Sequence, residues 1–242
     1  MHEARTVHKR LAALRMTGGV LRVRAAVALL LASCVAQPDV LTPARILRAT
    51  ADTYANCHTY RDSGRATTKL VTGELRPVMF APFQTAFERP DRFRFGVEGM
   101  MLGWIVWRHG PAIRSWSRHD GYEKPESLEL ALAALAGVSG GSSVTVPKLL
   151  LADAVHGPVL TEMTDVVRLE DADLGSSRCY CLRGRQASCT RTVWIDQTSH
   201  LLLRVVSELD VDGQQAEVSI TYEPVIDEPI PADLLAFGSP EG

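Results

Sequence analysis

Short segments of alternating apolar and polar residues recur along this chain, and they are the feature that most restricts its fold. The segment Arg92–Val97 alternates strictly, with Phe93, Phe95 and Val97 on one side and the arginines on the other, as in a strand with one buried and one solvated face. A series of such segments, separated by turn residues, predicts antiparallel sheet. Further strands are expected at residues 60–71, 85–88, 102–108, 112–117, 166–169, 179–183, 190–195, 201–207 and 217–222.

Two stretches of helical character interrupt the strands. Thr42-Pro43 pairs an N-cap residue with a proline of the first turn, which predicts a helix that ends near Asn56. The middle of the chain, residues 126–153, holds two segments that are apolar on most faces around a Gly/Ser loop. Helices of this kind are buried on several sides or cover an apolar surface. Within the strand at 60–71, Ser63-Gly64 suggests a β-bulge.

The order helix, strands, helical insert, strands predicts an α+β fold. We expect an incomplete antiparallel β-barrel, that is, one curled sheet, with a helical lid plugging its concave face. The tryptophans near that face are equally explained as core residues, because an open barrel needs an apolar lining with or without a ligand. The side chains expected to line the concave face are Phe93, Phe95, Trp104, Trp107, Trp116 and Trp194.

The N-terminal residues have the pattern of an export signal. Arg22 and Arg24 precede an apolar stretch, residues 25–32, which is too short to span a bilayer but suits the h-region of a secretory signal. The stretch ends in Leu31-Ala32-Ser33-Cys34. This resembles the bacterial lipobox, in which small residues precede a cysteine that receives a diacylglycerol.

The segment boundaries follow from this signal. We expect residues 1–33 to be a lipoprotein signal peptide, Cys34 to be the site of lipid attachment, residues 34–41 to be a tether and residues 42–242 to form a single domain. The start is open between Met1 and Met16, and a soluble secreted protein cleaved nearby is the alternative. The expected location is the bacterial cell envelope, facing the periplasm.

The charge balance restricts the partners. The net charge of −2 excludes the basic surface of a nucleic-acid-binding protein. Residues 1–33 hold six Lys/Arg and one Asp/Glu, so the remainder carries 20 basic and 27 acidic side chains, a net charge of −7. An acidic domain does not favour anionic membrane surfaces. We therefore expect membrane contact through the lipid on Cys34.

Four further cysteines suggest disulfides in an exported chain. A hairpin expected around Gly184–Ser188 places Cys181 opposite Cys189, so the preferred pairing is Cys181–Cys189 with Cys57–Cys179. The competing pairing is Cys179–Cys189. The Cys-x-Cys spacing fits zinc poorly and lacks the Cys-x-x-Cys of a redox dithiol, so no metal and no cofactor are expected.

Several motifs together resemble a known superfamily. They are Tyr-Arg-Asp-Ser-Gly at 60–64, the run from Thr85 to Phe95, Val193-Trp194-Ile195-Asp196, and Leu201-Leu202-Leu203-Arg204. They are similar to those of the outer-membrane lipoprotein-sorting (LolA/LolB-like) proteins, over roughly residues 42–237. The resemblance implies a half-barrel with a helical lid over an apolar cavity that shelters acyl chains. The lipobox, the extra cysteines and a long insert at 118–147 depart from the soluble carrier.

Catalytic patterns are missing from the sequence. There is no HExxH, P-loop, GxSxG or dinucleotide fingerprint. His119-Asp120 is interpreted as solvated surface, and the Ser139–Ser142 loop as a hinge of the lid instead of an anion site. The sequence therefore predicts that the protein is not an enzyme.

Two functions remain as hypotheses. The first is a non-catalytic envelope lipoprotein that binds an acyl chain or a lipidated segment in an apolar half-barrel cavity. The alternative is a structural or regulatory protein that binds another envelope protein, with the cavity filled by its own lid. An empty cavity favours the first, and a lid tightly packed by Leu128, Leu132, Leu149 and Leu151 favours the second.

Overall fold

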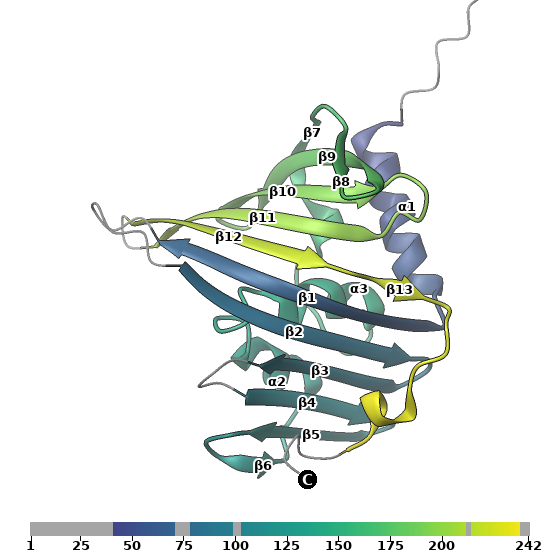
Figure 1. The fold of residues 1–242 in the computed structure, drawn as a ribbon, viewed down its shortest axis with the longest axis vertical. Coiled ribbons are helices and arrows are strands. Elements are labelled where there is room, and N and C mark those ends of the chain that lie inside the picture. The colour runs from purple at the N-terminus through teal and green to yellow at the C-terminus, as the bar shows by residue number, and fades with distance from the viewer. Residues whose placement is uncertain (1–40, 71–77, 99–102, 212–213, 238–242) are drawn as a thin grey trace, which may run out of the picture. The chain divides into compact units, whose positions relative to one another are not determined.

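One long antiparallel sheet dominates the computed structural model of the chain (Figure 1). The structure describes residues 41–70, 78–98, 103–211 and 214–237. Contacts gather residues 40–242 into one compact unit. The sheet has 13 strands, ordered β6-β5-β4-β3-β2-β1-β12-β11-β10-β9-β7, with β13 paired to β1 and β8 to β9. Every strand pair is antiparallel. The expected fold, a curled sheet that does not close into a barrel, is confirmed.

The elements follow the predicted order of helix, strands, helical insert and strands. Three α-helices and two short 3-10 helices accompany the strands in the described part of the chain. The bounds are α1 Pro43–Asn56, β1 Thr59–Leu70, β2 Val78–Glu88, β3 Arg92–Glu98, β4 Gly103–His109, β5 Ala112–Ser117, β6 Gly121–Glu123, α2 Leu128–Ala134, α3 Ser142–Leu150, η1 Leu160–Glu162, β7 Thr164–Arg168, β8 Ala172–Leu174, β9 Ser177–Gln186, β10 Cys189–Asp196, β11 Leu202–Val211, β12 Gln214–Tyr222, β13 Val225–Ile226 and η2 Ala232–Leu235.

Helix α1 begins and ends as its sequence predicts. The hydroxyl of Thr42 accepts a hydrogen bond from the Arg45 amide at 3.4 Å, and Pro43 occupies the first turn. At the other end, Arg89 donates to the carbonyl oxygens of Tyr54, Ala55 and Cys57 at 3.1, 2.6 and 2.7 Å. These carbonyls have no partner within the helix, so a cation there also opposes the negative end of the helix dipole.

Strand β1 runs straight where a bulge was expected. Its pairing with β2 and β12 continues without a shift through Ser63 and Gly64, so the bulge prediction was wrong. Glycine is required at 64 for space, because a Cβ there would overlap the Phe83 ring and the Thr221 carbonyl oxygen. The glycine thus marks a close approach of two strands and a ring instead of a break in the ladder.

The pairing register shows which residues share a face. Phe95 lies opposite Val106, and Val97 lies opposite Trp104, so these side chains share the concave face that carries the core. Arg94 lies opposite Trp107 on the convex face. The larger cluster of buried apolar side chains joins α1, the concave face of the sheet and the helical insert, whereas a small second cluster of Ile105, Trp107 and Trp116 lies apart from it.

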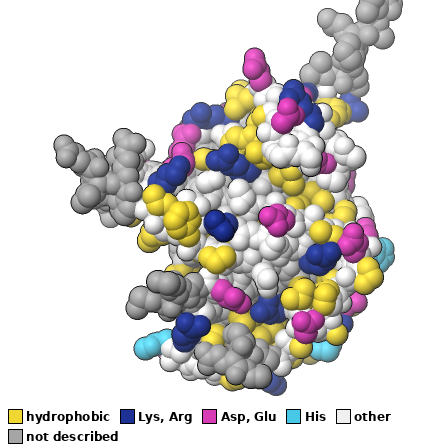
Figure 2. Space-filling model, viewed as in Figure 1, with side chains coloured by type: hydrophobic (Ala, Val, Ile, Leu, Met, Phe, Trp, Pro, Cys, Tyr) yellow, Lys and Arg dark blue, Asp and Glu magenta, His cyan; other side chains and the backbone are white. Residues whose placement is uncertain are grey.

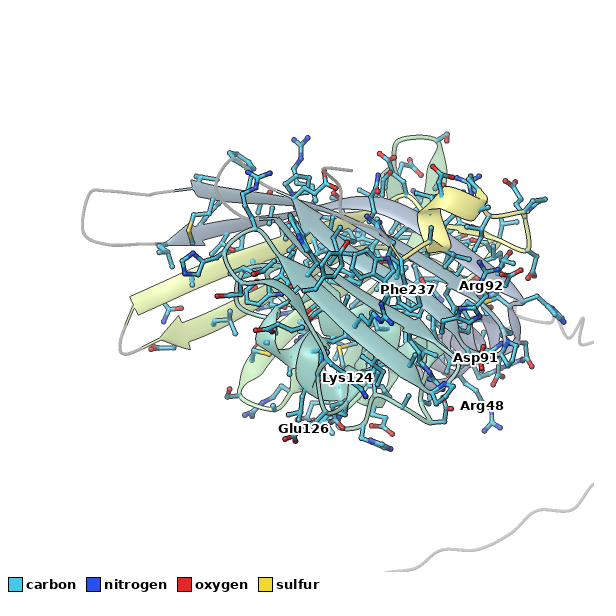
Figure 3. The ribbon with its side chains drawn as sticks, turned by 90° about the horizontal axis from the view of Figure 1, so that it is seen from below. Arg48, Asp91, Arg92, Lys124, Glu126 and Phe237 are labelled. Atoms are coloured by element: carbon cyan, nitrogen blue, oxygen red, sulfur yellow. The ribbon has the colours of Figure 1, made fainter. Side chains whose placement is uncertain are left out.

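The C-terminal segment covers the small convex cluster. Phe237 packs edge-on against Trp107 with ring centroids 5.9 Å apart, and the guanidinium of Arg114 lies over the Phe237 ring at 5.5 Å. Figure 3 shows Phe237 beside the sheet near the C-terminal turn, and Lys124 and Glu126 toward helix α2. The short helix η2 itself lies against β2 and β3, and Phe237, which follows it, covers the apolar convex surface at Trp107.

Candidate functional site

An apolar pocket lies between the concave face of the sheet and the loop that joins α2 to α3. Its volume is about 210 Å³. Small and apolar side chains from β1, β2 and β3 form the floor, and the loop at 137–140 forms the roof. The full lining is Ala66, Thr68, Met79, Phe80, Ala81, Val97, Glu98, Gly137, Val138 and Gly140. Glu98 is the one ionisable side chain among these ten.

The rim of this pocket exposes large apolar side chains. Val78, Met79 and Phe80 are 43, 56 and 62% exposed at the start of β2. Three consecutive exposed apolar residues on a strand are unusual unless they meet a partner or a ligand. In the space-filling view, hydrophobic side chains gather at the left edge, where Figure 1 shows the end of the β1–β2 pair (Figure 2). Because side chains alternate along a strand, Met79 shares the concave face with Ala66, Ala81 and the pocket, whereas Val78 and Phe80 face the convex side.

The helical insert fills the rest of the concave face. Leu128, Leu132, Leu149 and Leu151 are 2, 0, 7 and 1% exposed and belong to the main core cluster. The pocket is therefore what remains of the apolar cavity when the insert is packed onto the sheet. We call residues 127–156 the lid.

The hydrogen bonds of the lid are largely its own. Ser143 Oγ donates to the Leu132 carbonyl at 2.8 Å and so ties α3 to α2. Ser142 Oγ donates to the Ser139 carbonyl at 2.9 Å, and Thr145 Oγ1 to the Gly141 carbonyl at 2.9 Å. Because the lid satisfies its buried hydroxyls internally, its attachment to the sheet rests on apolar packing. Such a unit can move without leaving many buried polar groups unpaired.

The loop between the two lid helices has the conformational freedom of a hinge. Gly140 and Gly141 have φ angles of +60° and +88°, a region that residues with a Cβ rarely adopt. A Cβ at Gly140 would lie 2.9 Å from Val218 Cγ1 and 3.0 Å from Ala66 Cβ. The loop backbone thus touches the floor of the pocket directly.

A buried carboxyl group lies near the start of β1. Asp62 is 7% exposed, accepts a hydrogen bond from the Tyr60 hydroxyl at 2.6 Å, and accepts another from the Thr85 amide at 2.9 Å. Burial raises the pKa of Asp62 to about 6, although both hydrogen bonds lower it. Burial likewise holds the pKa of Tyr60 and Tyr222 well above the ordinary value. A small buried polar cluster therefore lies near the start of β1, and none of its members lines the apolar pocket.

The structure divides the predicted cavity residues between the two faces. Phe93 and Phe95 lie on the concave face in the main core, and Trp104 lies there half-buried. Trp107 and Trp116 lie on the convex face, so their prediction was wrong. Strand β4 is apolar on both faces, and alternation alone does not show which face is inside.

The prediction that Trp194 lines the concave face was also wrong. Its neighbours Val193 and Ile195 belong to the main core, so Trp194 points to the convex face. There the Arg204 guanidinium lies 5.0 Å from its ring centroid, a cation–π contact. None of these predicted aromatic residues lines the apolar pocket.

The four cysteines within the described residues are buried, unbridged thiols. The β9–β10 hairpin turns after Gln186, which pairs with Cys189, while Cys181 pairs with Trp194. Cys181 and Cys189 are therefore about 16 Å apart along the ladder, far beyond disulfide reach. The pairing Cys181–Cys189 was wrong because the hairpin centre lies near residue 187.

The second predicted pairing, Cys57–Cys179, was also wrong, because the two side chains lie on opposite faces of the sheet. Cys57 belongs to the main core cluster on the concave side. Cys179 alternates with Tyr180 and Leu182, which pack on that core, and so points to the convex side. The sheet therefore separates Cys57 from Cys179. The competing pair Cys179–Cys189 is too far apart along the ladder, because Cys179 pairs with Asp196 whereas Cys189 pairs with Gln186.

The described residues hold no group of three or more His, Cys, Asp or Glu side chains placed to bind a metal ion. The pair His119 and Asp120 is exposed, with 3.9 Å between His119 Nε2 and Asp120 Oδ1. In the described part, no helix has both the length and the apolar character needed to cross a membrane. Cys34 and the expected signal peptide lie outside the described residues.

The pocket residues were not found from the sequence. Ala66, Ala81 and Val138 are too small or too common to be distinctive, and the pocket forms only when the loop at 137–140 meets β1 and β2. The one available signal was the apolar run Val78-Met79-Phe80-Ala81, which precedes the strand expected at 85–88 and belongs to the same strand in the structure. Its length indicates a strand with an apolar exposed end.

No known protein family model matches the sequence, and no curated protein matches it either. Solved structures do resemble the fold. The lipoprotein LppX of Mycobacterium tuberculosis matches at a TM-score of 0.46 and 15% identity, over 79% of this chain and 98% of that one. LprF of Mycobacterium bovis matches at a TM-score of 0.48 and 11% identity, over 78% of this chain and 94% of that one.

A LolA superfamily protein of Nitrosomonas europaea matches at a TM-score of 0.35 and 10% identity, over 81% of this chain and 98% of that one. The structures similar to this chain thus include members of the superfamily that the sequence motifs resemble. At these identities the likeness concerns the fold alone, so the function has to come from the chain's own residues.

Proposed function

We propose that the protein is a non-catalytic binding module of the bacterial cell envelope that takes up one apolar chain, either an acyl chain or a lipidated segment. The observation that carries the proposal is the apolar pocket under the lid, with the exposed side chain of Met79 at its edge. Burial of each CH₂ group of such a chain contributes about 0.8 kcal/mol. We further propose that residues 42–242 form the binding domain and that a lipid on Cys34 anchors it.

The proposal requires the lid to move. A pocket of about 210 Å³ is smaller than the 300–1,000 Å³ of ordinary small-molecule sites. It accepts the end of a chain, and the remainder needs the space now filled by Leu128, Leu132 and Leu149. The glycine hinge and the self-contained hydrogen bonds of the lid allow it to lift as one unit.

A crosslink tests this directly. The double variant Ala66→Cys/Gly140→Cys places two Cβ atoms about 3.0 Å apart, about half an ångström below the shortest Cβ–Cβ distance of ordinary disulfides, so a small outward shift of the loop allows the bond to form. We expect the oxidised variant to lose uptake of a fluorescent fatty acid and the reduced variant to regain it. The single Gly140→Cys variant is the control for strain at the left-handed φ. Uptake by the oxidised double variant at the wild-type level would contradict lid opening.

A second candidate function has its own support. The tight packing of the lid fits a protein that binds an envelope partner through the exposed rim while its cavity stays closed. The variant Val138→Arg separates the two, because Val138 belongs to the loop that roofs the pocket and not to the exposed end of β2. Acyl binding predicts that this variant loses the lipid, whereas partner binding predicts no effect. The variant Ala133→Arg, at an exposed position of α2, is the matched control.

A further inference from the structure

A second pocket lies on the other flank of helix α3. Its volume is about 190 Å³, too small for a drug-sized ligand and suited to one small group. It is formed by α3, the loop before η1 and the end of the β9–β10 hairpin. The lining residues are Val144, Thr145, Lys148, Pro158, Leu160, Gln186, Ala187, Cys189 and Arg191.

The charge of this pocket has one sign. Lys148 and Arg191 contribute two cations from different elements, and no Asp or Glu lines the pocket. Other arginines form ion pairs with carboxylates: Arg168 lies 2.8 Å from Asp171, and Arg183 lies 2.8 Å from Glu208. Within the described part of the chain, neither Lys148 nor Arg191 forms such an ion pair. Two unneutralised cations at a concave site attract an anion.

Two residues of the pocket lining each carry a buried polar atom without a hydrogen-bond partner. The two atoms are Arg191 Nε, a donor, and Gln186 Oε1, an acceptor. Gln186 is only 9% exposed, and an unpaired buried polar atom is destabilising. A group that both accepts from Arg191 and donates to Gln186 would satisfy the two atoms together. A phosphate group that keeps one proton does this, because it offers acceptor oxygens and one P–OH donor.

We infer that the pocket between α3 and the β9–β10 hairpin is a binding site for a phosphate group, held by Arg191, Lys148 and Gln186. The group is either free inorganic phosphate or the phosphate headgroup of an amphiphile. The second source rests on the proposed function, since the apolar pocket and this one flank the same end of α3: Gly140 lines the first and Val144 lines the second. A lipid phosphate would then place its headgroup here and its tail under the lid.

Isothermal titration of the full chain with inorganic phosphate tests the site. We expect Arg191→Gln to weaken binding at least tenfold, because hydrogen bonds to charged groups are worth that much, and Lys148→Gln to weaken it several-fold. Arg185→Gln is the matched control, since Arg185 is exposed on the same hairpin and points to the convex face. Equal affinity in wild type, Arg191→Gln and Lys148→Gln would overturn the inference.

A variant of Gln186 separates binding from folding. Gln186→Met removes the unpaired acceptor at similar length, so we expect an unchanged or higher melting temperature with weaker phosphate binding. A purely structural role predicts a lower melting temperature and no change in phosphate affinity, which would overturn the assignment of Gln186.

The source of the phosphate is found by titrating dihexanoyl phosphatidic acid against dihexanoylglycerol, which lacks the phosphate. Tighter binding of the phosphatidic acid, lost in Arg191→Gln, identifies a headgroup. Binding of inorganic phosphate alone identifies the free ion, and in that case the phosphate site stands while its link to the apolar pocket fails; the proposed lipid-binding function is then decided by the fatty-acid uptake experiment. Binding of neither phosphate compound overturns the site.

Discussion

The buried carboxyl group of Asp62 makes a prediction about stability and pH. Asp62→Asn keeps the size of the side chain and both of its contacts: the amide oxygen accepts from the Thr85 amide, and the amide nitrogen donates to the Tyr60 hydroxyl oxygen. What the substitution removes is the ionisation. The pH dependence of stability that belongs to Asp62 therefore disappears in the variant.

The sign follows from the raised pKa. Burial raises the pKa of Asp62 to about 6 in the folded protein, against the ordinary value of 3.8 that applies in the unfolded chain. The folded protein therefore binds the proton more tightly than the unfolded chain, and the free energy of unfolding falls as pH rises between these values. Two pH units correspond to about 3 kcal/mol. The variant should gain about that much relative to wild type between pH 4 and pH 7, and the difference should stay constant above pH 7.

Urea unfolding at pH 4, 5, 6 and 7 measures this difference. Asp153→Asn is the control, because Asp153 is exposed at the end of the lid and the swap should leave the pH profile of wild type intact. A constant difference between Asp62→Asn and wild type across the whole range would refute the reasoning, since it would mean that Asp62 titrates alike in both states.

Three further outcomes can be measured by thermal or chemical unfolding and by thiol titration. Gly64→Ala should lower the free energy of unfolding by about 1–3 kcal/mol, because its methyl group meets Phe83, whereas Gly137→Ala, with open space around it, should change it little. Arg89→Gln should cost about 1–3 kcal/mol through the lost bonds to the end of α1, while Arg65→Gln, exposed on the convex face, should be neutral. Thiol titration in denaturant without reductant should find all four cysteines of the described part free; a count of two or fewer would contradict the unbridged structure.

The layout of the sheet was predictable where the pattern is local. The alternation of Phe93 and Phe95 with arginines identifies the inner face of β3 correctly, because only one side of that strand is apolar. Thr42-Pro43 likewise fixes the start of α1. In both cases the deciding interactions lie within a few residues of each other in the sequence.

The predictions failed where a distant segment decides. Trp107 is buried on the convex face because Phe237, far along the chain, covers it. Gly184 suggested a turn, but it lies within β9, where a Cβ would meet the Thr164 carbonyl oxygen at 2.9 Å. Strand glycines that permit close packing and turn glycines look the same in sequence, and this error shifted the expected hairpin and the disulfides with it.

The central claim is that an apolar chain binds under the lid. Native mass spectrometry of the full protein purified from the cell envelope, followed by lipid extraction, tests it most directly. The account predicts a co-purifying acyl species that is retained in Ala133→Arg and lost in Val138→Arg, with both variants folded. A protein mass free of any acyl species in repeated preparations, together with failure to take up added fatty acid, would contradict it.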